Sequence, residues 1–371
     1  MRIGMKTLVF LIGALLMLAP AIVAGVMFTD AMQRRAETAN AARLRVLGEI
    51  AANQLRMQML RLWQDVESMS RIVSLQNSDE VRRQLTLLAR VDRRYTWIGV
   101  ADVEGKVLAA SRGMLEGASV AERPWFRRGL NGPAATDVHE AVLLDKLLPA
   151  VPEPRRFVDF SAPIRNGEGA VIGVIGAHFD WGPIKDGFHV FRGQGVDALL
   201  VSRSREVLSG PSDLEGTILS VGSAIAAEQG ASVSLRERWS DGRDYMTVVV
   251  PLAWKDMPGF GWSVIVRADT DTVLDPTRSI ARAFWSLLGA GVLVGLALLY
   301  LFATWLAKPL RRLATTAEAL ANGRFDQPPH DETRYEEAAR LSAALVRLQT
   351  HSVRPYQPAP TKTGRKASPG P

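Results

Sequence analysis

Two uncharged apolar runs are the strongest feature of the hydropathy pattern. The first covers residues 7–28 (TLVFLIGALLMLAPAIVAGVMF), and the second covers residues 284–306 (FWSLLGAGVLVGLALLYLFATWL). Each run exceeds the ~20 residues that a helix needs to cross the hydrocarbon core of a bilayer. We therefore predict two transmembrane helices. A cleaved signal peptide is the alternative for the first run, because the sequence APA at 19–21 is compatible with cleavage.

A helical pattern with almost no Gly or Pro follows over residues 29–94. Its apolar residues recur at steps of three or four, which predicts one stripe along a long stalk helix. The stripe consists of Leu44, Leu47, Ala51, Leu55, Met59, Leu62, Val66, Met69 and Val73. Two interpretations remain open. The stripe contacts a second copy of the chain, packs on the chain's own domain, or does each at a different height along the helix.

Short β-rich runs begin at Tyr95 and are separated by turn signals such as NGEG at 166–169. The runs form two batches that repeat in the same order. The tripeptide LEG occurs at 115–117 in the first batch and at 214–216 in the second. We therefore predict an α+β fold with two small tandem domains of antiparallel strands, at residues 95–192 and 193–275.

Two short heptad-like seams follow the second apolar run. A connector that contains Gly323 and a Pro pair separates them. The seam residues are Leu310, Leu313, Ala317 and Leu320, then Ala338, Leu341, Leu345 and Leu348. Because two short helices cannot bury both seams alone, residues 307–351 are expected to form a dimeric parallel four-helix bundle. An amphipathic helix on the membrane surface is the alternative. The Pro-rich residues 352–371 are predicted to be a disordered tail.

Charge distribution sets the expected topology. The 371 residues carry a formal net charge of +7. Residues 1–6 hold +2 of it and the segment after residue 306 holds +5, so the long middle segment is neutral. The positive-inside rule then places both flanks in the cytoplasm and residues 29–283 outside it. A basic surface for nucleic acid is therefore not expected, and the absence of Cys excludes disulfides and thiol chemistry.

No catalytic signature stands out in the sequence. A Gly-rich phosphate loop, a Cys nucleophile and a clustered set of metal ligands are all missing from the pattern, and nothing marks a Ser-His-Asp set. We therefore expect a protein that is not an enzyme and that has no cofactor.

Residues 29–275 resemble the double Cache sensor, a pair of PAS-like domains outside the membrane in bacterial receptors. The resemblance is carried by ERPWFRRGL at 122–130, VDFSAPIRNGEG at 158–169 and GVIGAHFDW at 173–181. It implies a bacterial inner-membrane protein whose membrane-distal domain binds a small molecule. The membrane-proximal domain lacks the R-x-W motif and is expected to act as a spacer and transmitter.

The family's ligand motif R-x-W-[YF] falls on Arg123, Trp125 and Phe126. In amino-acid-binding members an Asp on a late strand takes the ammonium group, but that position falls on His178 here. An imidazole is a poor partner for an ammonium group, whereas an Arg beside aromatic rings can hold a carboxylate. The resemblance therefore favours a carboxylate or another anion as the ligand.

Two Asp–His pairs are further candidates for the ligand pocket. Asp137 and His139 are two residues apart, as are His178 and Asp180, so each pair shares a face if the backbone is extended. Together they could form a two-His, two-carboxylate metal site. The alternatives are that His139 is a surface or cap residue and that His178 hydrogen-bonds in the core. No bound metal is expected.

The segment after the second apolar run resembles a HAMP linker. Pro309, Gly323 and Glu337 match the family's positions, whereas Ala338 and Ala339 replace a large aliphatic residue and a Gly. Residues expected to transmit the signal through the second span and the linker are Gly291, Gly295, Pro309, Leu313, Leu320, Gly323, Glu337 and Leu341. The two Gly residues form a small-xxx-small pair that permits close helix approach or a hinge.

These features predict a membrane-bound receptor that works as a homodimer. A small ligand outside the cytoplasm would shift a two-state dimer, and the HAMP bundle would act in trans on an unidentified cytoplasmic partner. Two alternatives remain open. The chain is either a shortened, non-catalytic relative of a Cache–HAMP diguanylate cyclase, kinase or chemoreceptor, or a membrane scaffold without a ligand.

Overall fold

The computed structural model describes residues 3–140, 144, 147–148, 155–188, 195–324 and 331–353. The chain divides into two compact units. One unit comprises Met32–Arg278, and the other comprises Met1–Ala31 together with Ser279–Pro371.

The unit Met32–Arg278 contains two five-stranded antiparallel sheets with the same strand order. The distal sheet has the order β2-β1-β5-β4-β3, and the proximal sheet has the order β7-β6-β10-β9-β8. The distal strands are β1 (Tyr95–Asp102), β2 (Val107–Ala110), β3 (Ala134–Glu140), β4 (Arg156–Arg165) and β5 (Val171–Asp180). The proximal strands are β6 (Val196–Val201), β7 (Val207–Ser209), β8 (Ser234–Arg238), β9 (Asp244–Pro251) and β10 (Ser263–Asp269). The α+β fold with two tandem domains is therefore confirmed.

The repeated LEG tripeptide makes the same turn in both sheets. Gly117 has a φ of +77° and Gly216 a φ of +75°, values that favour glycine. The carboxylate of Glu116 accepts a hydrogen bond from the backbone N–H at the end of β2 (3.0 Å), and that of Glu215 accepts one just after β7 (3.1 Å). The sequence repeat is thus a structural repeat.

Arg82 holds the Glu116 carboxylate with two hydrogen bonds of 2.7 Å. This contact is the main reason that the pKa of Glu116 is lowered. A lowered carboxylate pKa adds stability above the ordinary pKa of glutamate, and that stability is lost as the pH falls through the lowered value. We expect the melting temperature of the wild type to fall more than that of Glu116→Gln between about pH 6 and about pH 3.5. Equal losses in the two proteins would contradict this assignment.

The described residues of the two units also form helices. They are α1 (Met5–Ile72), α2 (Ser78–Val91), the 3₁₀ turn η1 (Ser111–Gly113), α3 (Pro124–Asn131), α5 (Trp181–Phe188), α6 (Gly222–Glu228), α7 (Thr270–Ala321) and α8 (Glu336–Val353). The start of α2 shows why its sequence forms a helix. The Asn77 side chain accepts the Glu80 N–H at 3.1 Å, and Asp79 and Glu80 lie in the first turn, where negative charge is favourable.

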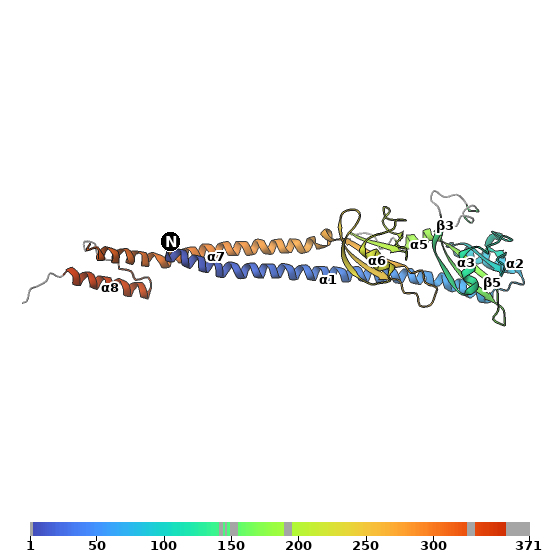
Figure 1. Ribbon diagram of the computed structural model, residues 1–371, viewed down its shortest axis with the longest axis horizontal. Helices are drawn as coiled ribbons and strands as arrows, with labels where there is room; N and C mark the ends of the chain where they lie inside the picture. Colours follow the sequence, from blue (N-terminus) through green and yellow to red (C-terminus); the bar gives the residue numbers. More distant parts are fainter. Residues whose placement is uncertain are drawn as a thin grey trace, which may run out of the picture. The chain divides into compact units, whose positions relative to one another are not determined.

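The apolar stripe of α1 packs within the chain. The helix runs past both sheets (Figure 1), and the stripe contributes to one continuous hydrophobic core with them. Seven stripe residues are buried, namely Leu44, Ala51, Leu55, Met59, Leu62, Val66 and Val73, while Leu47 and Met69 are partly buried. Of the two interpretations of the stripe, packing on the chain's own domain is therefore the one that the structure shows.

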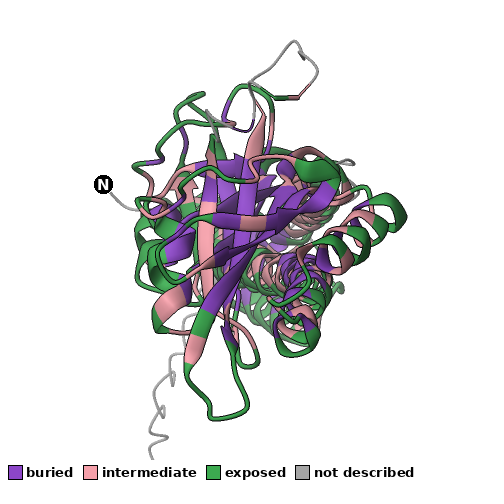
Figure 2. Ribbon diagram, turned by 90° about the vertical axis from the view of Figure 1, so that its right-hand side faces the viewer, coloured by how far each residue is buried: buried purple, intermediate pink, exposed green. Residues whose placement is uncertain are grey.

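Alternation along β4 gives the distal sheet two different faces. Val158, Phe160 and Ala162 belong to the core shared with α1. On the opposite face, Phe157 belongs to a separate core, and Ser161 donates a hydrogen bond to a carbonyl oxygen of α3 at 2.7 Å. Figure 2 shows the strands of the sheet that faces the viewer as mostly buried, with helical turns on either side. A movement of β4 would therefore change the packing on both faces of the distal sheet.

An aromatic cluster joins the distal and proximal halves of this unit. The Phe160 ring lies 5.5 Å from the Phe260 ring, which stacks on Trp262 at 4.2 Å. Trp181 also meets Trp262 edge to face at 5.5 Å. The Trp262 indole N–H donates to the Asp137 carboxylate at 2.7 Å. The two halves are thus linked by packing and by a directional hydrogen bond.

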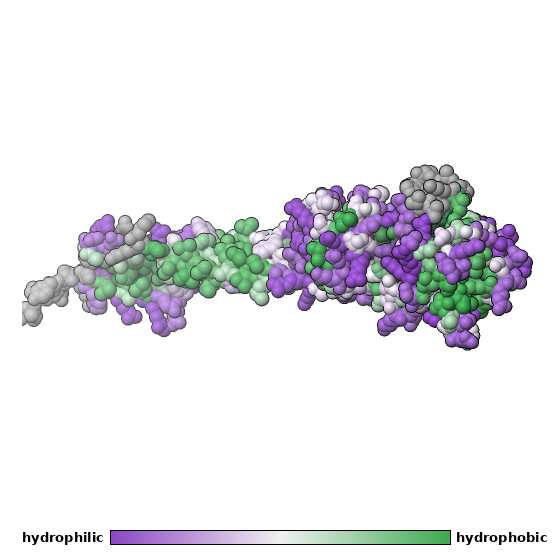
Figure 3. Space-filling view, turned by 45° about the vertical axis from the view of Figure 1, so that its right-hand side comes forward, coloured by the Kyte–Doolittle hydropathy of each residue, from purple (hydrophilic) through white to green (hydrophobic). Residues whose placement is uncertain are grey.

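The other unit contains the two apolar runs, which lie on α1 and α7. Both helices are long and apolar enough to cross a membrane, and their apolar windows are only 11% and 6% buried. Hydrophobic residues gather along them (Figure 3). A core helix of a soluble domain would be mostly buried, so this exposure favours contact with lipid.

Small residues bring the two apolar runs together. A Cβ placed on Gly295 would lie 2.3 Å from the Met17 side chain, and Gly25 is covered in the same way by Trp285. Gly291 has nothing within 4 Å among the described residues. The predicted close approach therefore rests on Gly295 and on glycines of the first run.

The segment after the second run forms the predicted pair of short helices. Leu313 at the end of α7 is buried with Ala338 and Leu345 of α8, and Leu320 packs against them. Leu341 is 45% exposed. The single chain thus buries only part of the second seam. The connector residues 325–330 and the tail from residue 354 lie outside the described residues.

The three family-matching residues of this segment occupy different environments. Pro309 is buried and Glu337 is exposed. Gly323 has a φ of +75°, and its N–H bonds to the Leu320 carbonyl oxygen at the end of α7 (3.0 Å). The sequence did not single out Glu332, which is buried and accepts a hydrogen bond from Arg312 at 3.0 Å.

Candidate functional site

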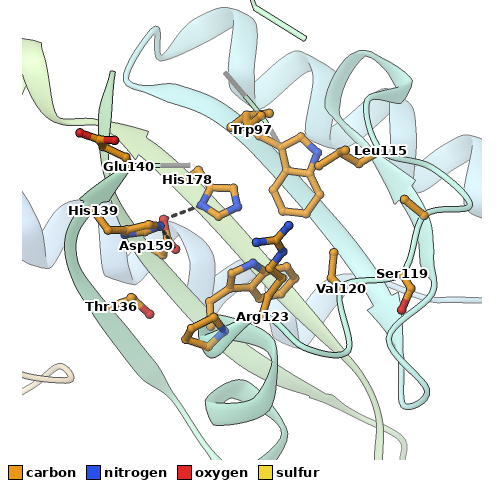
Figure 4. Close-up of a pocket in the computed structure, with 14 residues that line it drawn as sticks. Trp97, Leu115, Ser119, Val120, Arg123, Thr136, His139, Glu140, Asp159 and His178 are labelled. Carbon is orange, nitrogen blue, oxygen red and sulfur yellow. Dashed lines mark hydrogen bonds and ion pairs between the residues drawn. The ribbon is translucent and has the colours of Figure 1, made fainter. Parts of the chain in front are cut away.

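A cavity of about 230 Å³ lies on the face of the distal sheet that is turned away from α1. One end is apolar and the other is polar, and Arg123 lies between them (Figure 4). Trp97, Leu115 and Val120 lie at the apolar end with Ser119 beside them, and Trp125 and Leu144 also line the cavity. The polar end is lined by Thr136, His139, Glu140, Asp159 and His178.

Arg123 is aimed into the cavity by the start of α3. It is the N-cap residue, and Pro124 occupies the first turn of the helix, where its fixed φ is favourable. The extended backbone of Arg123 directs the guanidinium between His178 and Trp97 (Figure 4). Within the described part of the chain no group pairs with this guanidinium, whereas the nearby Arg127 pairs with Glu122. Arg123 is therefore available for an anion.

Two indole rings form the wall beside Arg123, and each lies flat on a glycine of the sheet. A Cβ on Gly176 would lie 2.4 Å from the Trp125 ring, and a Cβ on Gly99 would lie 2.3 Å from the Trp97 ring. The two ring centroids are 5.8 Å apart. Phe126, the third motif residue, is buried against Trp125 and does not line the cavity.

The polar end is centred on Asp159, which is 1% exposed. Asp159 on β4 and His178 on β5 are direct neighbours across the strands, and the Asp159 Oδ1 atom lies 2.5 Å from the His178 Nδ1 atom. The Oδ2 atom lies 3.3 Å from the His139 Nε2 atom. The sequence analysis missed Asp159. The available signal was a carboxylate in the middle of an apolar strand, in FVDFSA at 157–162.

Asp137 and Asp180 lie outside this cavity. The register of β3 shifts between Thr136 and His139, so Asp137 faces Trp262 while His139 faces the cavity. Burial raises the pKa of Asp137, although the Trp262 hydrogen bond acts in the opposite direction. Asp180 ends β5, and its carboxylate accepts the Gly182 N–H at 2.9 Å. The two predicted histidines therefore meet around Asp159 rather than around these two carboxylates.

Comparison with family models decides the family. The model described as Cache domain matches residues 29–277, which is most of the chain. The chain belongs to the Cache domain family. A second model, described as HAMP domain, matches residues 301–350. A comparison with curated proteins gave no match.

Solved structures share the architecture of this Cache domain at low identity. The ligand-binding domain of the Pseudomonas fluorescens chemoreceptor CtaA, in complex with L-leucine, is 16% identical, with 66% of this chain and 99% of that chain covered and a TM-score of 0.49. The ligand-binding domain of the Pseudomonas aeruginosa PAO1 amino acid chemoreceptor PctB, in complex with L-Arg, is 18% identical. The match covers 62% of this chain and 95% of that chain, with a TM-score of 0.48. A methyl-accepting chemotaxis protein X is 15% identical, with 63% of this chain and 99% of that chain covered and a TM-score of 0.50. This level of similarity concerns the fold alone.

The Cache domain, the HAMP domain and the two candidate membrane helices together define the class of protein. It is a membrane receptor for sensory signal transduction with an extracellular sensor domain. Its Cache domain carries the cavity described above in the distal sheet, and the proximal sheet is the half from which α7 leaves.

Proposed function

We propose that the receptor binds a small molecule that carries a carboxylate in the distal cavity. The guanidinium of Arg123 supports this proposal most directly, because it is unpaired among the described residues and points into a cavity that Trp97 and Trp125 also line. Arg and carboxylate form two parallel charge-assisted hydrogen bonds, and these are stronger where water is excluded. The rings supply that exclusion.

The cavity also limits the size of the ligand. Its volume of about 230 Å³ suits a small ligand. A mono- or dicarboxylic acid, or a small amino acid, is of this size. The polar end would then receive the groups of the ligand that are not held by Arg123.

Transmission is proposed to begin on β3 and β4. On β3, His139 faces the cavity and Asp137 bonds to Trp262 of the proximal half. On β4, Asp159 faces the cavity and the next residue, Phe160, lies in the core shared with α1. A ligand that binds one arrangement of these strands better than another would shift the population of the receptor.

The signal is proposed to cross the bacterial inner membrane through a homodimer. Residues 7–28 and 284–306 would span the membrane, and residues 29–283 would lie outside the cytoplasm. The HAMP segment, residues 307–351, would pair its incompletely buried seam with a second copy and act on a cytoplasmic partner. The exposure of Leu341 supports this pairing.

A thermal-shift screen of the full chain in lipid nanodiscs tests the ligand class. The panel comprises mono- and dicarboxylic acids, amino acids, amines and purines. A compound at 100 times its Kd adds ~2.7 kcal/mol to the stability of the folded state, so a binder produces a clear shift. We expect shifts only from compounds with a carboxylate. Shifts from amines or purines that lack one would contradict the proposal.

The Trp262→Phe variant tests the route between the halves. The substitution removes the indole N–H that bonds to Asp137 but keeps an aromatic ring. Because Trp262 is not a cavity residue, carboxylate binding should stay within about twofold of wild type. The chain has no Cys, so Ala283→Cys provides a single crosslinking probe at the start of the second span.

We expect the carboxylate to change the crosslinking rate of Ala283→Cys several-fold, and Trp262→Phe to remove most of that change. If the variant binds the carboxylate and still changes its crosslinking as the parent does, the contact between Trp262 and Asp137 is not part of the route. If no crosslinked dimer forms in either protein, the proposed homodimer is wrong.

A further inference from the structure

The polar end of the cavity places two hydrogen-bond acceptors face to face. The His139 Nδ1 atom lies 2.9 Å from the backbone carbonyl oxygen of Asp137, which can only accept, so Nδ1 carries the hydrogen. The neutral ring then presents the lone pair of Nε2 to the Asp159 Oδ2 atom, 3.3 Å away. Among the described residues, this buried carboxylate oxygen has no hydrogen-bond partner. Such an arrangement is costly unless a positive charge lies between the two atoms.

His178 completes a three-residue cluster around this point. Its ring is held by Trp97 and Trp125, whose centroids lie 5.2 and 6.0 Å from it, and its exposed fraction is 8%. One ligand atom each from His139, Asp159 and His178 lies within 4.8 Å of the other two. Figure 4 shows the three side chains converging at one end of the cavity.

The separations suit a tetrahedral metal ion. Zinc ligands lie at ~2.0–2.1 Å from the ion, so two of them stand roughly 3.3 Å apart in a tetrahedron. The His139–Asp159 separation already has this value. The other oxygen of Asp159, Oδ1, lies 2.5 Å from the His178 Nδ1 atom. One ion therefore reaches all three residues if the carboxylate turns or binds it through both oxygens.

We propose that His139, Asp159 and His178 bind a divalent transition-metal ion such as Zn²⁺. Imidazole nitrogen with one carboxylate suits Zn²⁺, Co²⁺, Ni²⁺ or Cu²⁺, whereas Mg²⁺ and Ca²⁺ prefer oxygen ligands alone. The hydrogen bond from His139 Nδ1 to a backbone carbonyl is the usual second contact of a metal-binding histidine. Three protein ligands leave a further coordination position for water or for a bound molecule.

The cluster is also placed to affect signalling. Asp159 and His178 lie on β4 and β5, in the middle of the sheet, whereas His139 lies on the edge strand β3. A metal ion would therefore tie the edge strand to the centre of the sheet. The same strand carries Asp137, which contacts Trp262 of the proximal half. This inference rests on the proposed function insofar as the cavity is the sensory pocket.

Titration of the full chain in nanodiscs with ZnCl₂ alone, after removal of metals with a chelator, tests the metal site. We expect one Zn²⁺ per chain with a Kd below about 1 µM. Asp159→Asn keeps the shape of the side chain but removes its charge, and His139→Ala removes one ligand from a partly exposed edge position. Each is expected to weaken Zn²⁺ binding about 100-fold or more. The matched control, His351→Ala on α8, should bind as the wild type does.

CoCl₂ gives a second readout that does not depend on affinity alone. Bound Co²⁺ is expected to show visible absorption bands of a site with nitrogen and oxygen ligands, and these bands should be lost in His139→Ala. The inference is wrong if the wild type binds no Zn²⁺ below about 10 µM, or if Asp159→Asn and His139→Ala bind it as the wild type does.

Arg123→Ala separates this inference from the proposed function. The variant should keep Zn²⁺ binding and lose carboxylate binding. Carboxylate binding that persists with full affinity in chelator, in a protein that binds no Zn²⁺, would leave the proposed function intact and overturn the metal site. If the protein binds Zn²⁺ but no carboxylate in the panel, the metal site stands and the proposed function is wrong.

Discussion

Replacing Arg123 with alanine is expected to weaken the binding of a panel carboxylate by roughly 30- to 700-fold, which corresponds to about 2–4 kcal/mol. The loss is large because Arg123 is the only Arg or Lys among the described residues that line the cavity. The fold should be unaffected. Arg123 is only partly buried and has no partner in that part of the chain, so its stability effect should be within about 0.5 kcal/mol.

Isothermal titration of the full chain measures this effect. Arg128→Ala is the matched control, because Arg128 lies on α3, which Arg123 precedes, is exposed and does not line the cavity. It should bind the carboxylate within about twofold of wild type. Equal losses in the two variants would indicate a general effect of positive charge rather than a specific clamp by Arg123.

The Phe160→Ala variant is expected to have the largest effect on stability. Phe160 is fully buried, and its ring packs on Trp63 of α1, on Phe179 and on Phe260, with centroid distances of 5.8, 5.8 and 5.5 Å. Truncation of a buried Phe to Ala costs about 3–5 kcal/mol. For a domain of this size that should lower the melting temperature by roughly 6–20 °C.

Thermal unfolding of the full chain measures this change. Val46→Ala is the control, because Val46 lies on α1 but is 54% exposed, and it should shift the melting temperature by no more than about 2 °C. Phe160→Leu should lower the melting temperature less than Phe160→Ala does, because it leaves a smaller void. A Phe160→Ala protein as stable as the wild type would mean that β4 and α1 are not firmly packed, and the proposed route through β4 would lose its basis.

The architecture was accessible from sequence because it depends on patterns that are local or repeated. The LEG turns need glycine at a positive φ, and they recur in both halves with the same hydrogen bonds. The stripe on α1 has a helical period wherever it packs, so the period identified the helix but not its partner. Only the tertiary structure shows that the stripe is buried against the two sheets of the same chain.

The candidate site could be predicted from the sequence in part. Arg123 and Trp125 were identified through the R-x-W motif of the Cache resemblance, and both line the cavity. His139 and His178 were identified, but their carboxylate partner was not. Asp159 meets His178 through cross-strand pairing, which a single sequence does not specify. Asp137 lies outside the cavity because the register of β3 is irregular, and no residue pattern had indicated that irregularity.

Hydrogen exchange of the full chain, with and without the best carboxylate from the panel, tests the central claim most directly. The account predicts slower exchange at the start of α3 and along β4 and β5, where the cavity is built, and a smaller change at the start of α7. Slower exchange confined to the outer face of the proximal sheet, or a carboxylate that binds without protecting α3, β4 or β5, would contradict it.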